Sequence, residues 1–194
     1  IEKKDSAMYY ADKAFAEAKK LNYIHGIAVS FVRKSRIAKH FDDDFIQSEA
    51  LARESLRWYE KTLNKKNIYD VYYELQYSVF AQSRYSEAIE YAQKKCEWSK
   101  ENNDELSMLD ALSSIPSIYK SAGNYEKSFE YCQQLHQQAV KANNKIFLSY
   151  SFFQLGELYM KIGDYPSALS YYRQAFQMDD PEILNARVTG DWDK

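Results

Sequence analysis

The residues best suited to metal binding or nucleophilic catalysis are few and isolated. The two cysteines, Cys96 and Cys132, form no CxxC pair, and the three histidines, His25, His40 and His136, form no cluster with one another. A structural zinc site needs about four ligands at short spacings. We therefore expect no metal site, two reduced and partly buried thiols, and histidines that serve in packing or at the surface. A disulfide between the cysteines is left open.

A run of three carboxylates at 42–44 is the other candidate for chemistry. It lacks the glycine and the spaced ligands of a calcium loop, so we interpret it as an exposed connection that caps the next helix. The chain also shows no Gly-rich phosphate loop, no HExxH helix and no nucleophile elbow. These observations predict a protein without catalytic residues or cofactor, and not an enzyme.

Composition narrows the class of partner. The chain has 194 residues with 26 Lys and Arg against 28 Asp and Glu, a net charge of −2. This balance argues against a nucleic-acid partner, since such binders are usually basic. No uninterrupted apolar stretch approaches the ~18 residues of a membrane span. The first residue is Ile1 and no signal-peptide pattern follows it, so we expect a segment of a longer protein. A cytoplasmic location and an extracytoplasmic part of a membrane-bound sensor both stay open.

A short pattern recurs three times at a spacing of 40 residues. Each copy has an aromatic residue, a small residue three positions later and a tyrosine three positions after that: Tyr85, Ala88 and Tyr91; Tyr125, Ser128 and Tyr131; Tyr165, Ala168 and Tyr171. Two copies open on a glycine, Gly123 or Gly163, which favours a left-handed helix end. Asn124 and Asp164 follow these glycines and suit an N-cap. The small residue lets two helices approach closely. A weaker copy around Phe45 has the carboxylates at 42–44 in place of the turn.

The segment before each turn also repeats, and its residues give the pattern a family likeness. Phe152, Leu155, Gly156 and Tyr159 precede the last turn. With the turn pattern that follows, these residues resemble the tetratricopeptide repeat (TPR), which is a pair of helices. The resemblance implies an all-α fold, a right-handed superhelical α-solenoid of antiparallel helix pairs with the first helix of each pair on the concave side. The repeat is longer than the usual ~34 residues and in this resembles the repeats of bacterial regulatory proteins and of some eukaryotic adaptor proteins. Pro116 takes the place of Gly156 one repeat earlier, and we expect it to bend its helix.

The repeat predicts the position of each helix. We expect a single TPR-like array over 1–194, with a lone helix at 3–21 and repeats at about 24–63, 68–101, 104–143 and 145–178. The expected helices lie at 24–40, 45–63, 68–82, 85–101, 104–121, 125–143, 145–162 and 165–178. A tail at 179–194 follows, in which 182–188 could begin a further helix.

The concave face of the first helices is the predicted partner-binding groove. Placing core positions inward leaves the following residues for it: Arg33, Arg36 and His40 from the helix at 24–40; Tyr73, Tyr77 and Phe80 from 68–82; Asp110, Ser113, Ser114 and Ser117 from 104–121; Tyr150, Phe153, Gln154 and Glu157 from 145–162. Aromatic side chains in such a groove are good anchors for a partner. The alternative, that some of them pack between repeats, stays open. The basic cluster from Arg33 to His40 is either a solvated helix face or a site for an acidic peptide.

These features favour a non-enzymatic scaffold that binds a protein or peptide in its concave groove. By resemblance, it would be the interaction or sensing module of a larger bacterial signalling or transcription-regulatory protein. The alternative is self-association, for example as a homodimer, through the apolar ends that solenoids expose when uncapped. A small-molecule sensor is the least favoured of the three.

Overall fold

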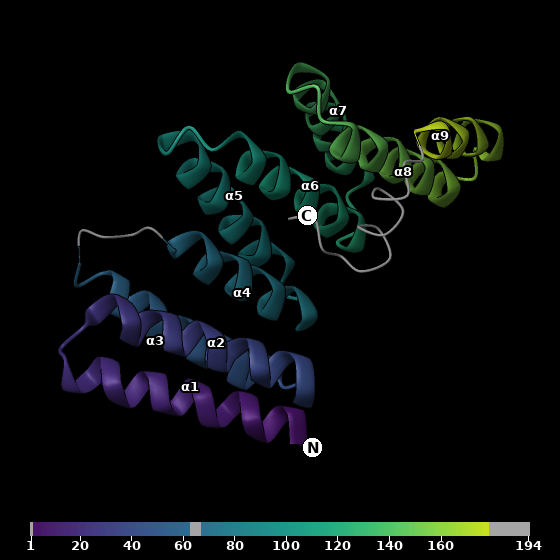
Figure 1. Ribbon diagram of the computed structural model, residues 1–194. Coiled ribbons are helices and arrows are strands. Elements are labelled where there is room, and N and C mark those ends of the chain that lie inside the picture. Colours follow the sequence, from purple (N-terminus) through teal and green to yellow (C-terminus); the bar gives the residue numbers. More distant parts are fainter. Residues whose placement is uncertain (1, 63–66, 179–194) are drawn as a thin grey trace. The chain divides into compact units, whose positions relative to one another are not determined.

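The computed structural model describes residues 2–62 and 67–178, and these residues form nine α-helices and no strand. The predicted all-α helical repeat fold is confirmed (Figure 1). The helices are α1 (Glu2–Lys20), α2 (Ile24–Asp42), α3 (Phe45–Tyr59), α4 (Ile68–Ala81), α5 (Tyr85–Glu101), α6 (Glu105–Ser121), α7 (Tyr125–Lys141), α8 (Lys145–Ile162) and α9 (Tyr165–Gln177).

The chain divides into two compact units, a first unit of Ile1–Lys95 and a second unit of Cys96–Lys194. In the first unit α1 packs on α2, α2 on α3 and α3 on α4, while α2 also touches α4. In the second unit α6, α7, α8 and α9 pack in the same consecutive order, and α6 also touches α8. Within each unit, helices contact their neighbours along the chain. This pattern is typical of a helical repeat solenoid, in which each repeat contacts only the adjacent repeats.

The turn before α9 shows how the repeated pattern reverses the chain. Gly163 caps α8 with a φ of 84°, in the left-handed region that glycine enters without a Cβ penalty. The carboxylate of Asp164 then accepts a hydrogen bond from the Ser167 backbone N–H at 3.2 Å. Before α7, Gly123 is likewise left-handed, with a φ of 77°. The side-chain oxygen of Asn124 accepts a 3.0 Å hydrogen bond from the Lys127 N–H. The predicted helix ends and caps are confirmed at both turns.

Three asparagines take the left-handed conformation at the joints between repeats. Asn22, Asn103 and Asn143 have φ values of 51°, 52° and 50°. Asparagine is among the few residues that tolerate this region. Ser83, where the other two copies of the pattern have glycine, is also left-handed at 60°. These asparagines and Ser83 therefore lie where one helix stops and the next begins.

Small residues in the pattern lie at close helix crossings. Ala88, Ser128 and Ala168 are all buried. The Ser128 hydroxyl donates a 2.7 Å hydrogen bond to the carbonyl oxygen of Pro116, across the crossing of α6 and α7. At Gly156 an added Cβ would lie 2.7 Å from the ring of Tyr172, closer than van der Waals contact allows. The glycine of the Leu-Gly signature therefore gives the α9 tyrosine room to pack on α8.

The helix boundaries follow the repeat with one larger difference. α3 ends at Tyr59, ahead of residue 63, and α6 continues through Pro116 to Ser121. The segment 182–188, where a further helix could begin, lies outside the described residues. No helix of the described chain combines the length and the hydrophobicity that a membrane span requires.

Candidate functional site

Two exposed tyrosines on α4 form the aromatic part of the α2/α4 face, which we define by Arg33, Arg36, Lys39, Tyr73 and Tyr77. Tyr73 and Tyr77 are 37% and 43% exposed, and they stand one helical turn apart, so their side chains share one side of the helix. The Lys39 ammonium lies 5.1 Å from the Tyr73 ring centroid and 4.4 Å from that of Tyr77. Both distances are within the range of a cation–π contact. The lysine therefore links two rings that solvent still reaches.

A cluster of opposite charges beneath the rings positions this lysine. The Lys39 ammonium lies 2.6 Å from one oxygen of Glu74, and Arg36 donates to the other oxygen at 2.7 Å. A second Arg36 nitrogen lies 2.9 Å from Asp70. Glu74 is fully buried and Lys39 is 5% exposed, and a buried charge is stable only when it is paired and hydrogen-bonded. Burial acts to lower the pKa of Arg36, but its bonds and charge interactions with Glu74 and Asp70 outweigh burial and raise that pKa.

The basic cluster of α2 is divided among several neighbours. Lys34 pairs with Asp12 of α1 at 2.6 Å and lies over the Phe15 ring, whereas Arg36 and Lys39 pair with α4. Arg33 and His40 are exposed. The charge that this cluster could offer to an acidic peptide is thus reduced, because Lys34, Arg36 and Lys39 are paired within the first unit.

Sequence reasoning missed Asp70 and Glu74, the carboxylates of this cluster. A signal was present, because Arg36 and Lys39 lie three residues apart and Asp70 and Glu74 lie four apart. Each pair occupies one side of its helix, so two complementary pairs on successive first helices indicate an ion cluster between them.

The third aromatic expected on α4 packs rather than projecting freely. Phe80 is half-buried, and its ring centroid lies 5.8 Å from that of Tyr85 at the start of α5. Tyr77 approaches Phe45 of α3 at 6.1 Å. Phe80 therefore follows the packing alternative, while Tyr73 and Tyr77 keep an exposed surface.

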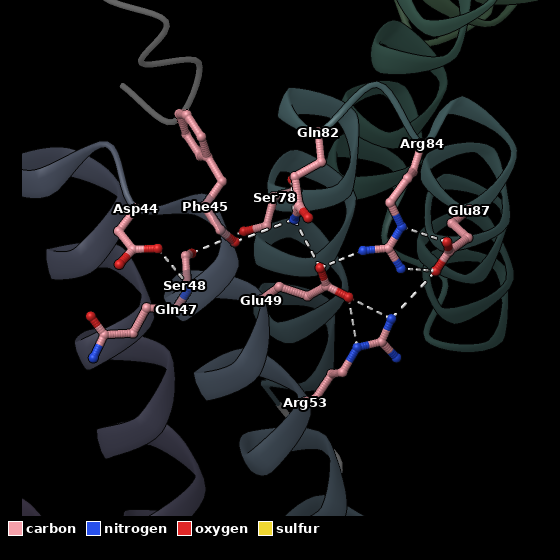
Figure 2. A network of polar contacts seen from close by, with 10 residues as sticks. All are labelled: Asp44, Phe45, Gln47, Ser48, Glu49, Arg53, Ser78, Gln82, Arg84 and Glu87. Carbon is pink, nitrogen blue, oxygen red and sulfur yellow. Dashed lines mark hydrogen bonds and ion pairs between the residues drawn. The ribbon is translucent and has the colours of Figure 1, made fainter.

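A second polar network joins α3, α4 and the start of α5 (Figure 2). Glu49, buried on α3, accepts bonds from Arg53 at 2.8 Å, from Arg84 at 2.6 Å and from Gln82 at 2.8 Å. Arg84 also donates twice to Glu87, at 2.7 and 2.5 Å. Burial alone raises the pKa of Glu49, but the bonds from Gln82, Arg53 and Arg84 outweigh it, so the net pKa is lowered. Figure 2 shows the Glu49 carboxylate between the two guanidinium groups, with its hydrogen-bonding positions used inside the protein. We interpret this network as structural.

In the second unit, the predicted groove residues of α6 and α8 form internal links. Gln154, expected on the concave surface, is only 2% exposed, and its amide donates to the Ser113 carbonyl oxygen at 2.7 Å. Ser117 donates to the Gln154 amide oxygen at 3.3 Å. The Lys120 ammonium contacts Glu157 at 2.6 Å. Gln154 therefore joins α6 and α8 and is not exposed to a partner. Its side-chain amide satisfies the Ser113 carbonyl oxygen, which would otherwise need a water molecule.

The other predicted residues of this unit are partly covered. Tyr150 and Phe153 are half-buried, and burial raises the pKa of Tyr150 to about 12. The Phe153 ring lies 5.5 Å from that of Tyr172 on α9. Ser114 bonds the Ala111 carbonyl oxygen of its own helix at 2.8 Å, and Asp110, also half-buried, accepts from Ser113 through its backbone carbonyl at 2.7 Å. The structure thus leaves less free aromatic surface on α6 and α8 than on α4.

The cysteines and histidines lie in packed or surface positions. Cys132 is a buried thiol, and burial raises its pKa to about 12, so it is not a reactive thiolate. His136 contacts the Ser151 hydroxyl at 3.0 Å, and burial lowers its pKa. His25 packs between the rings of Tyr23 and Tyr59. Within residues 2–62 and 67–178, no three His, Cys, Asp or Glu side chains gather as a metal site would require.

Comparison with known families agrees with the repeat pattern. Residues 107–180 match the profile of the tetratricopeptide repeat family. This segment contains α6 to α9 apart from the first residues of α6. The matched segment is therefore of the TPR type, with repeats longer than usual, as the sequence predicts. No curated protein sequence matches the chain.

Solved structures of TPR-like proteins share the fold. A signal transduction ATPase with numerous domains (STAND) from Pyrococcus horikoshii, which has a tetratricopeptide repeat sensor, aligns with a TM-score of 0.80 and 22% identity over 99% of this chain and 30% of its own. The apo form of RapI aligns with a TM-score of 0.77 and 20% identity over 94% of this chain and 52% of its own. The TPR-like repeats of a putative kinesin light chain from Podosopora anserina align with a TM-score of 0.75 and 16% identity, over 97% of this chain and 89% of their own.

These likenesses show the fold. The chain spans about half of RapI and under a third of the ATPase. Repeats of this class are typically protein-interaction modules, and the matched segment indicates such a module.

Proposed function

We propose that this chain is the partner-binding or sensing part of a larger signalling or transcription-regulatory protein, and that it binds a peptide segment through its first helices. The observation that carries the proposal is the pair of exposed rings on α4, Tyr73 and Tyr77, held by the Lys39 ammonium. The scaffold would act by binding alone, without catalysis.

The physical argument rests on preorganisation. A tyrosine offers a large apolar surface with a polar tip and is enriched at binding hot spots. Ordering a side chain on binding costs about 0.5–1.5 kcal/mol, and Lys39 reduces this cost by contacting both rings in advance. Since Glu74 neutralises Lys39 internally, the partner need not supply a carboxylate for it. A peptide with an apolar side chain against the rings fits this surface, and Arg33 is exposed to meet a carboxylate beside it.

The signalling context is supported by the solved structures alone. The P. horikoshii protein is a signal transduction ATPase whose TPR part is a sensor. A similar placement beside an effector domain would suit this chain, because a TPR module supplies recognition and leaves the output to another domain.

The proposal is tested by capture from a source lysate, read by mass spectrometry, with Tyr73→Ala/Tyr77→Ala beside the wild type. The control is Tyr9→Ala/Tyr10→Ala, which removes another exposed tyrosine pair from the same unit. We expect a partner that binds the wild type and the control and is lost from the α4 variant, with all three proteins folded by circular dichroism. Retention of every partner by the α4 variant would exclude this face as the binding site.

Self-association is the second candidate, and an observation on α9 favours it. Tyr165, Leu169 and Phe176 are large apolar side chains that are more than half exposed. Light scattering at high concentration tests this candidate. A dimer that Leu169→Lys/Phe176→Lys converts to a monomer would support it, and a wild-type monomer at every concentration would exclude it.

A further inference from the structure

A small cavity lies between α7 and α8 of the second unit, apart from the α2/α4 face. Its volume is about 240 Å³. An apolar cavity of roughly 150 Å³ holds benzene, whereas pockets for drug-sized ligands begin at about 300 Å³. The space therefore suits a compact head group. The lining residues are Tyr125, Glu126 and Phe129 of α7 and Leu158, Tyr159 and Ile162 of α8.

Three of the six lining residues are aromatic, and two of their rings are set at right angles. The Phe129 and Tyr159 centroids lie 5.9 Å apart with an interplanar angle of 86°. Tyr159 is held from outside the cavity by Tyr171, which stacks on it at 5.3 Å and 10°. Tyr125, the third ring, is 40% exposed. Aromatic faces carry negative partial charge, so rings around a small space attract a cation placed between them.

The charge of the lining residues also favours a cation. Glu126 is the one ionisable carboxylate among the lining residues, and within the described chain it forms no ion pair. The neighbouring Lys127 directs its ammonium over the Tyr119 ring, 5.5 Å from the centroid. A cation is attracted by the Glu126 carboxylate and by the rings, while an anion meets no lining cation.

We propose that the cavity of α7 and α8 binds a small alkylammonium group, such as a trimethylammonium head group. Leu158 and Ile162 contact its methyl groups, the rings of Tyr125, Phe129 and Tyr159 face its charge, and Glu126 neutralises it. This site goes beyond the proposed function, since none of its residues belongs to the α2/α4 face. The same group occurs in free quaternary amines and in methylated lysine side chains.

Isothermal titration of the whole chain with choline tests the proposal. The matched control ligand is 3,3-dimethyl-1-butanol, which has the shape of choline and a carbon atom in place of the charged nitrogen. We expect choline to bind and the neutral alcohol to bind at least about tenfold more weakly, because cation–π contacts and the carboxylate act only on the charge. Equal binding of the two ligands, or no binding of choline at millimolar concentrations, overturns the proposal.

Variants locate the site. Tyr125→Leu removes an exposed ring and Glu126→Gln removes the lining charge, and each is expected to weaken choline binding by about 3- to 30-fold. Glu130→Gln is the control, since it removes a carboxylate outside the cavity and should leave the affinity unchanged. Phe129 is not substituted because it also packs against the core cluster of Cys132, Leu155 and Leu158. Unchanged affinity in both cavity variants, with folding intact by circular dichroism, overturns the assignment.

Two further measurements distinguish a methylated lysine from a free amine, and this site from the α2/α4 face. A peptide with trimethyllysine that displaces choline more strongly than free choline assigns the group to a protein side chain, and weaker displacement assigns it to a free amine. Either result supports alkylammonium recognition. Choline binding by Tyr73→Ala/Tyr77→Ala is expected to equal that of the wild type, so failure of the peptide-binding proposal leaves this one testable.

Discussion

Glu74 is the residue on which the α2/α4 face depends. It is fully buried and accepts from Arg36 and from Lys39, the lysine that contacts Tyr73 and Tyr77. Breaking a buried charge cluster by removing one member is costly because a charge then stays buried without a partner. The same residue therefore affects both the stability of the first unit and the order of its exposed rings.

Replacing Glu74 by Gln is expected to destabilise the protein by about 3 kcal/mol, because Lys39 would remain buried without a counter-charge. Urea unfolding followed by circular dichroism measures the loss. The control is Glu54→Gln, which breaks the more exposed pair of Glu54 with Arg57 and should cost no more than about 1 kcal/mol. Equal losses in the two variants would contradict a buried cluster.

The network around Glu49 predicts a dependence of stability on pH. Its three hydrogen-bond donors outweigh burial and hold the pKa of Glu49 below the ordinary value of 4.5. The bonds from Arg84 likewise lower the pKa of Glu87. A lowered folded-state pKa gives stability that is fully present above the unfolded pKa and is lost as the pH falls through the folded one. We therefore expect the melting temperature to fall as the pH drops below about 4.5.

Glu49→Gln tests the origin of this dependence. The variant should melt lower than the wild type at about pH 6, where Glu49 is ionised, and should lose less on acidification to about pH 3. Glu90→Gln, which removes an exposed carboxylate of α5, serves as the control and should follow the wild-type curve. Parallel curves for wild type and Glu49→Gln would mean that the network does not couple stability to pH.

At the scale of the helix pair, close approach depends on residues that are small. Ala168 is buried where α9 packs on α8, and Gly156 leaves room on α8 for the Tyr172 ring. Neither position has space for a larger side chain, since protein interiors are packed as densely as organic crystals. The aromatic and small residues of the pattern therefore work as a unit.

Ala168→Leu overpacks this crossing and is expected to cost about 1–3 kcal/mol, because α8 and α9 must separate or the leucine must adopt a strained rotamer. Thermal unfolding measures the change. Leu169→Ala, at the adjacent exposed position, should change stability by less than about 0.5 kcal/mol. An unchanged melting temperature for Ala168→Leu would contradict the alignment of the repeats.

At the scale of the whole molecule, contacts run from each helix to its near neighbours. The first unit is built from α1 to α4 with the start of α5, and the second from the rest of α5 to α9. Stability in such arrays is approximately a sum over repeats and their interfaces. A substitution in one repeat is therefore expected to destabilise that repeat and its neighbours more than the rest of the chain.

Hydrogen exchange of Ala168→Leu tests this locality. Amide exchange should accelerate in α8 and α9, whose packing is changed, and should stay at the wild-type rate in α1 to α3. Mass spectrometry of peptic fragments gives the rates for each helix. A uniform acceleration along the chain would show that the two units unfold as one cooperative body.

Much of the fold could be predicted from the sequence because the repeat signal is local. Gly163 and Asp164 specify a helix end and a cap through their own backbone preferences. The spacing of Tyr165, Ala168 and Tyr171 indicates one side of a helix without knowledge of its neighbours. Repetition at 40 residues then places the other helices.

The candidate site required the tertiary structure because exposure depends on what packs across from each residue. Tyr77 and Gln154 were both expected in the groove, yet Tyr77 is exposed beside Lys39 whereas Gln154 is buried against Ser113. The cavity beside Phe129 and Tyr159 arises only where α7 meets α8. The sequence by itself determined the helices, their caps and the TPR-like repeat pattern, since these follow from local preferences and periodicity. The tertiary structure decided which charges are paired and which rings face solvent, since both depend on contacts between residues distant in sequence.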